Sequence, residues 1–125
     1  DFNGQAAPYI QSAYVRANSI LKKYNAPLPA SLAPGGGLTP SEIALIDLIG
    51  RMPIEIQKAA KELKPLTVCN LSYDLAKAFN DFYVQCPVLN ADEPVKSTRL
   101  RLVAAAKQAI ENSLALLGIT APQAM

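Results

Sequence analysis

The chain has 125 residues, with 12 Lys and Arg, 10 Asp and Glu and no His, and this length suits one domain with a single core. The absence of histidine excludes a Ser–His–Asp or Cys–His catalytic pair and any histidine metal ligand. Two cysteines exclude a four-cysteine zinc site, and a net charge of +2 gives no strong electrostatic attraction for nucleic acid or membrane. No apolar run is long enough to span a bilayer.

The first residue and the two cysteines bear on the origin of the chain and on its redox compartment. Asp1 begins it without a methionine or a signal-peptide pattern, which indicates a piece cut from a longer protein. Because Cys69 and Cys86 lack a secretory context, we expect reduced thiols in a cytosolic protein. Cys86 follows an aromatic stripe and precedes a proline, so a buried structural thiol is favoured over a reactive one.

The placement of four prolines predicts helices. Each stands just before a stretch with helical apolar periodicity, in the first-turn position where proline costs a helix nothing: Pro8, Pro40, Pro53 and Pro65. No segment alternates apolar and polar residues for long enough to predict a strand. The sequence therefore predicts an all-α bundle of about five helices.

The first helix is predicted at about residues 8–24, and a loop follows it. Apolar residues recur every three or four positions, at Ile10, Ala13, Ala17, Ile20 and Tyr24. Residues 25–38 contain three prolines and three consecutive glycines, which predicts a surface loop or hinge inside the domain. The glycines lack the Lys-Ser/Thr of a phosphate-binding loop.

Two short helices are predicted next, at residues 39–50 and 53–63. Thr39 suits the N-cap of the first, and Glu42, three residues on, completes a capping box. The second would turn these residues inward: Ile56, Ala59, Ala60 and Leu63.

The last two helices are predicted at about 66–85 and 95–117. The fourth carries an apolar stripe of seven residues and ends where Pro87 forbids its continuation. The fifth has a similar stripe, and Gly118 suits the position after its C-terminus.

Only one surface offers a candidate site, because the carboxylates are scattered over polar faces. A second stripe on the first helix, rotated by roughly 100° from the apolar one, contains Tyr9, Ser12, Arg16, Ser19 and Lys23. A ring that stacks on a base and cations that meet phosphates suit an unpaired nucleotide. The alternative is that the ring packs over the helix start and the rest is a solvated face. Tyr83 has the same two interpretations: a ring that stacks on a base, or a residue at the rim of the core whose hydroxyl needs a partner.

Three segments carry a family resemblance: APYIQSAYVRANSILKK, LSYDLAKAFNDFYVQCPVL and RLRLVAAAKQAIENSLALLGITAPQAM. In this order they closely resemble the C-terminal domain of arginyl-tRNA synthetases, the all-helical anticodon-binding module of class I synthetases called the DALR domain. The likeness runs from about Gly4 to Met125. It implies that residues 1–125 form a single anticodon-binding domain, with 25–38 as an internal loop.

The resemblance implies a partner and a division of labour. The module would grip the anticodon loop of arginine tRNA in the cytoplasm, with no DNA or membrane partner. The HIGH and KMSK-type motifs do not occur in this sequence. The resemblance therefore implies a Rossmann catalytic domain upstream, which would bind ATP and magnesium, whereas this domain alone is non-catalytic and needs no cofactor or metal.

The resemblance also assigns the RNA-binding residues. Tyr9, Arg16, Tyr83 and Met125 match family positions that line the anticodon pocket, and Gln11 matches in a supporting role. Two departures are Ser12, where the family commonly has a second tyrosine, and Tyr14, where it often has histidine. The predicted RNA-binding set is Tyr9, Ser12, Arg16, Tyr83 and Met125, with no catalytic residue. The alternative function is a helical protein–protein interaction module without RNA contact, which the near-neutral charge favours.

Overall fold

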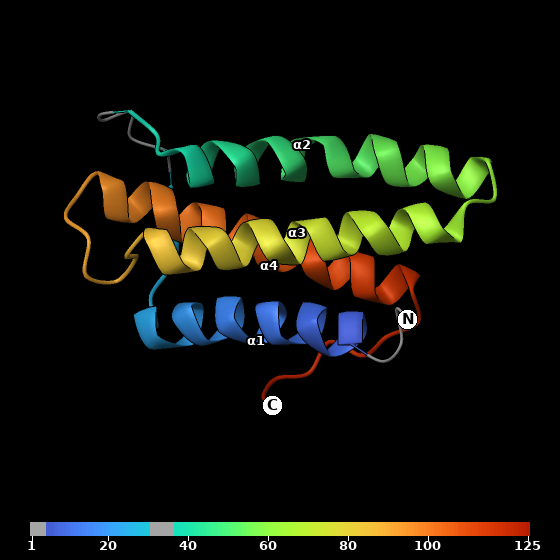
Figure 1. The fold of residues 1–125 in the computed structure, drawn as a ribbon. Coiled ribbons are helices and arrows are strands. Elements are labelled where there is room, and N and C mark those ends of the chain that lie inside the picture. The colour runs from blue at the N-terminus through green and yellow to red at the C-terminus, as the bar shows by residue number, and fades with distance from the viewer. Residues whose placement is uncertain (1–4, 31–36) are drawn as a thin grey trace.

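The computed structural model describes residues 5–30 and 37–125. Within them the chain forms four helices and no strand: α1 (Ala7–Tyr24), α2 (Pro40–Lys61), α3 (Pro65–Gln85) and α4 (Val95–Leu116) (Figure 1). The predicted all-α class is confirmed. None of the described helices has the length and apolar character needed to cross a membrane.

The helices are arranged so that α1 and α2 lie on opposite sides of α3 and α4 (Figure 1). Consecutive helices run in opposite directions, so α1 and α3 run the same way (Figure 1). The register between these two is regular: Tyr9 meets Tyr73, and Arg16 hydrogen-bonds Asn80, 64 residues further along the chain. A parallel pair in fixed register brings matching turns of α1 and α3 together along one face of the bundle.

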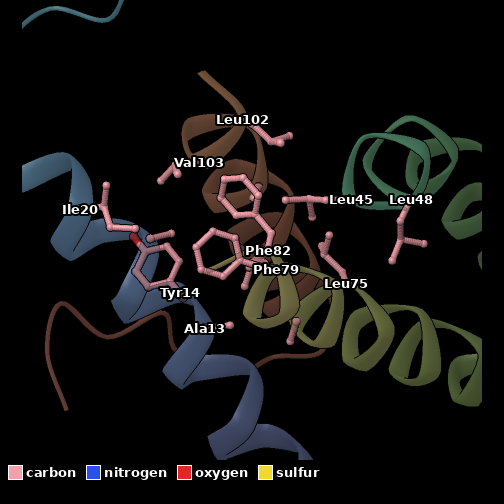
Figure 2. Close-up of a cluster of buried hydrophobic side chains, with 14 of the residues drawn as sticks. Ala13, Tyr14, Ile20, Leu45, Leu48, Leu75, Phe79, Phe82, Leu102 and Val103 are labelled. Atoms are coloured by element: carbon pink, nitrogen blue, oxygen red, sulfur yellow. The ribbon is translucent and has the colours of Figure 1, made fainter. Parts of the chain in front are cut away.

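The core is centred on two phenylalanines of α3. Phe79 and Phe82 are fully buried, with ring centroids 5.9 Å apart. Figure 2 shows them between Tyr14 of α1, Val103 of α4 and Leu45 of α2. Every helix therefore contributes side chains to one core.

The start of α2 confirms the predicted capping box. The Thr39 hydroxyl accepts from the Glu42 N–H at 3.3 Å, and the Thr39 N–H donates to the Glu42 carboxylate at 2.8 Å. Arg99 of α4 reaches the same carboxylate at 3.2 Å. Burial raises the pKa of Glu42, but hydrogen bonds with Thr39 and Arg99 outweigh burial, so that pKa lies below its ordinary value. The cap thus also ties α2 to α4.

The prediction of two separate helices at 39–50 and 53–63 was wrong, because α2 runs through Pro53 without a break. An internal proline lacks an N–H donor and destabilises a helix by about 3 kcal/mol. Here one apolar face is buried on both sides of the proline, at Leu45, Leu48, Met52 and Ala59. Burial of that shared face outweighs the local cost, so the count is four helices rather than five.

The inward set predicted for residues 53–63 was only partly right. Ala59 is buried and Ile56 is half-buried, but Ala60 is exposed. Leu63 is 86% exposed and lies beyond the helix with a positive φ of 56°. Helix α2 ends at Lys61, two residues before the predicted end at residue 63.

The remaining loops and cysteines agree with the sequence where they are described. Gly118 follows α4 with φ of 71°, the left-handed conformation that favours glycine. Cys86 is buried, with its Sγ 3.3 Å from the hydroxyls of both Thr39 and Ser41, which fits a structural thiol. Part of the predicted loop, residues 31–36, lies outside the described residues. Before that gap, Arg101 donates to the Pro29 carbonyl oxygen at 2.7 Å.

Candidate nucleic-acid interface

The structure brings together two of the predicted site residues, Arg16 of α1 and Tyr83 of α3. The guanidinium carbon of Arg16 lies 4.7 Å from the centroid of the Tyr83 ring, and its Nη1 donates to Asn80 Oδ1 at 2.9 Å. This is the distance of a cation–π contact. The hydrogen bond to Asn80 fixes the guanidinium, so the pair forms an ordered platform.

The Tyr83 ring in this platform is accessible. Tyr83 is 42% exposed, while Phe79, whose ring centroid is 6.5 Å away, is fully buried beside it. The sequence left open whether Tyr83 is simply a rim residue with a satisfied hydroxyl. The structure places it at the rim, with Arg16 on its ring.

Tyr9, the third predicted residue, pairs with a ring that sequence reasoning missed. The centroids of Tyr9 and Tyr73 are 5.0 Å apart, with the ring planes tilted by 31°. Tyr73 is 39% exposed, nearly as much as Tyr83. A signal was present in the sequence, because Tyr73, Lys77 and Asn80 follow at four and three residues, which places them on one helical face.

We call this shared surface the α1–α3 strip. It comprises Tyr9, Ser12 and Arg16 of α1 with Tyr73, Asn80 and Tyr83 of α3. Ser12 is half-buried and lies one helical turn after Tyr9. The strip therefore has a hydroxyl group, and no aromatic ring, at this position.

Tyr14 cannot supply the ring that Ser12 lacks. It is buried in the core beside Phe79 and Phe82 (Figure 2). Its hydroxyl donates to Glu111 at 3.2 Å. Burial and the negative charge of Glu111 raise the pKa of Tyr14. Tyr14 therefore belongs to the packing of α1 against α4.

The C-terminal segment is held against α1 on a different flank. Gln11 Nε2 donates to the Thr120 carbonyl oxygen at 2.9 Å, and Asn18 Nδ2 donates to Gln123 Oε1 at 3.4 Å. At 100° per residue these two side chains lie roughly 150° around α1 from Arg16. Met125 is 71% exposed. Its predicted role in RNA binding stays a prediction.

Comparison with known families settles which family this helical domain represents. A family model described as "DALR anticodon binding domain" matches residues 10–125. The chain belongs to this family. The resemblance inferred from the three sequence segments is thereby confirmed.

Curated relatives of this DALR domain are much longer proteins. It is 41% identical over 132 residues to the arginine–tRNA ligase of Thermococcus sibiricus, a match that covers all of this chain and 20% of that protein. It is 42% identical over 125 residues to the arginine–tRNA ligase of Methanocella arvoryzae, covering all of this chain and 22% of the relative. The chain thus spans about a fifth of the length of the curated relatives it matches.

A solved structure shares both the fold and part of the sequence. The arginyl-tRNA synthetase of Thermus thermophilus superposes with a TM-score of 0.82 at 32% identity, over all of this DALR domain and 22% of that chain. The likeness supports the four-helix arrangement, including the parallel placement of α1 and α3.

The described part of the DALR domain offers no metal centre. No group of three or more Cys, Asp or Glu side chains among the described residues is arranged to hold a metal ion. The α1–α3 strip remains the candidate site, and its chemistry is that of aromatic faces, amides and cations.

Proposed function

We propose that this DALR domain binds the anticodon loop of arginine tRNA through the α1–α3 strip. The observation that carries the proposal is the exposed Arg16–Tyr83 pair, in which a guanidinium and an aromatic ring are held together at 4.7 Å. Proteins recognise single-stranded RNA loops by stacking unpaired bases on aromatic rings and guanidinium planes. Each stacked base contributes about 1–3 kcal/mol.

The charge of Arg16 supports this role. Its hydrogen-bond partner, Asn80, is neutral, so the hydrogen bond orients the guanidinium without cancelling its charge. Arg99 makes a useful contrast, since the buried carboxylate of Glu42 neutralises it. Arg16 is therefore suited to contact a phosphate or a base edge, which explains how a chain of net charge +2 can bind RNA locally.

Two further residues complete the proposed site. Ser12 lies between Tyr9 and Arg16 and would offer a hydroxyl to the backbone or 2′-OH of the loop. Met125, which is 71% exposed, would add an apolar contact. Both contributions are smaller than those of the rings.

The parent protein would be an arginine–tRNA ligase, the name that its curated relatives carry. It would work in the cytoplasm. Its catalytic domain, carried by the same chain, would use ATP and magnesium to join arginine to the tRNA. This domain would position the tRNA and would have no catalytic activity alone. Aminoacylation by the isolated 125-residue chain would contradict this division.

The test is the affinity for an RNA hairpin with the anticodon stem-loop of arginine tRNA. Tyr83→Ala should weaken binding at least about tenfold, because a stacked base loses its ring. Ile54→Ala, which truncates an exposed side chain on α2, across the bundle from α1, is the control and should bind like the wild type (Figure 1). Equal affinities for all three proteins would refute the proposal.

A salt titration of the same complex separates RNA binding from the protein–protein alternative. The logarithm of the association constant should fall linearly with the logarithm of salt concentration, with a slope of about −0.7 for each phosphate contacted. A chain that shows no measurable binding to the hairpin at low salt would favour the alternative.

A further inference from the structure

We infer that Tyr9 and Tyr73 form a second base-binding position, distinct from the Arg16–Tyr83 platform, so that the domain holds two unpaired bases that are not neighbours in the RNA. This inference rests on the proposed function and specifies how much of the loop the α1–α3 strip reads. It gives a binding role to Tyr73, which neither the family match nor the sequence pattern assigned.

The first step is the geometry of the pair. The ring centroids of Tyr9 and Tyr73 lie 5.0 Å apart and the ring planes are tilted by 31°. One ring steadies the other, which lowers the entropy lost when a base stacks on the pair. A preformed aromatic surface of this kind accepts any base, because every base has a π-face.

The second step is exposure. Tyr73 and Tyr83 are 39% and 42% exposed, while the phenylalanines of the same helix are fully buried. Phe79 and Phe82 serve the core, whereas the two tyrosines keep ring surface that a base can reach. The two tyrosines present comparable accessible surface on the same side of the bundle.

The third step is spacing. Tyr9 and Arg16 are seven residues apart on α1, or about 10 Å along the helix, and Tyr73 and Tyr83 are ten residues apart on α3, or about 15 Å. Stacked neighbouring bases are only about 3.4 Å apart. Because α1 and α3 run parallel, the two positions stay separated along both helices (Figure 1). The bases they hold would therefore have at least one nucleotide between them, as in a splayed loop.

The fourth step is the charge between the two positions. Lys77 lies one turn after Tyr73 and one turn before Asn80 on the same face of α3. Its ion pair with Asp81 is 3.4 Å long and both side chains are more than half exposed, so the pair is weak. Lys77 also lines a pocket between α2 and α3 with Ser41 and Asp81, so its long side chain lies at the border of the strip. From there its ammonium group would reach a phosphate between the two bound bases.

The experiment uses the full 125-residue chain and the arginine anticodon hairpin, with a single abasic nucleotide placed at each loop position in turn. Tyr73→Ala should weaken binding of the intact hairpin about tenfold and should abolish the penalty of an abasic nucleotide at one loop position. Tyr83→Ala should do the same at a different, non-adjacent position. Tyr73→Phe should bind like the wild type, since it keeps the ring.

Two controls separate binding from folding. Ile54→Ala should retain affinity and the full abasic profile. If Tyr73→Ala loses helicity by circular dichroism, Tyr73→Leu takes its place, because leucine keeps an apolar contact with Tyr9 but offers no ring.

The outcomes distinguish the inference from the proposed function. Wild-type affinity of Tyr73→Ala, alongside a loss in Tyr83→Ala, would overturn the second position and leave the proposed function intact. Loss of the penalty at the same loop position in both variants would also overturn it, since one position would serve both rings. Wild-type affinity of Tyr83→Ala would remove the proposed function and the inference together.

Discussion

Helix α3 carries two pairs of aromatic side chains that face different surroundings. Phe79 and Phe82 have no exposed surface and form the centre of the core, whereas Tyr73 and Tyr83 are about two-fifths exposed and contact α1 at the rim. The buried pair carries no polar atom, and the exposed pair carries two hydroxyls. On this one helix the rings that point into the core stabilise the fold, and the rings at the rim are available to bind a partner.

The largest effect should come from the buried pair. Phe79→Ala removes a fully buried ring that contacts residues of several helices, and it should lower the free energy of unfolding by about 3–5 kcal/mol. Urea denaturation followed by circular dichroism measures this loss. A loss below about 1 kcal/mol would mean that the core side of α3 does not carry the stability assigned to it.

An intermediate effect should come from the polar contact on the core side of the bundle, between Glu42 and Arg99. Glu42 is 3% exposed, and Glu42→Gln keeps its shape but removes the charge, so stability at pH 7 should fall by about 1–3 kcal/mol. The matched control is Glu55→Gln, on the exposed face of α2, which should change stability by less than about 0.5 kcal/mol.

The pH dependence of stability identifies the same carboxylate. The folded pKa of Glu42 lies below its ordinary value of 4.5, so the unfolded chain binds the proton more readily. Its stabilising contribution is complete above pH 4.5 and is lost as pH falls through the lower folded pKa. The wild type should therefore lose more stability than Glu42→Gln between pH 6 and pH 3, which urea denaturation at each pH measures. Parallel pH profiles would contradict the assignment.

The smallest effect on stability should come from the exposed rings. Tyr83→Ala removes a cation–π contact at an exposed site, worth about 0.5–1 kcal/mol, while its effect on RNA binding should be larger. Urea denaturation gives the first value and hairpin affinity the second. A loss of stability as large as that of Phe79→Ala would abolish the contrast between the two sides of α3.

The sequence predicted the helices whose stability is decided locally. The apolar periodicity of residues 8–24, 66–85 and 95–117 and the Thr39–Glu42 capping box depend on neighbours along the chain, and all of them were confirmed. The continuity of α2 could not be predicted this way. The cost of Pro53 is local and visible, but the burial that outweighs it depends on how α2 packs on α3 and α4.

The candidate site was predictable in part. The stripe on residues 9–23 pointed to Tyr9 and Arg16, because it could be read from a single helix. Their partners Tyr73, Asn80 and Tyr83 depend on the register between α1 and α3, which is a tertiary property. The exposed face of α3 was nevertheless visible as a spacing pattern, and it would have identified Tyr73.

The most direct test of the central claim is a double-mutant cycle on the Arg16–Tyr83 pair, read by affinity for the arginine anticodon hairpin. Arg16→Gln and Tyr83→Ala should each weaken binding about tenfold. Since the two side chains form one platform, the double variant should lose less than the product of the single losses. Equal affinity of the wild type and all three variants would contradict the claim that this exposed pair binds RNA.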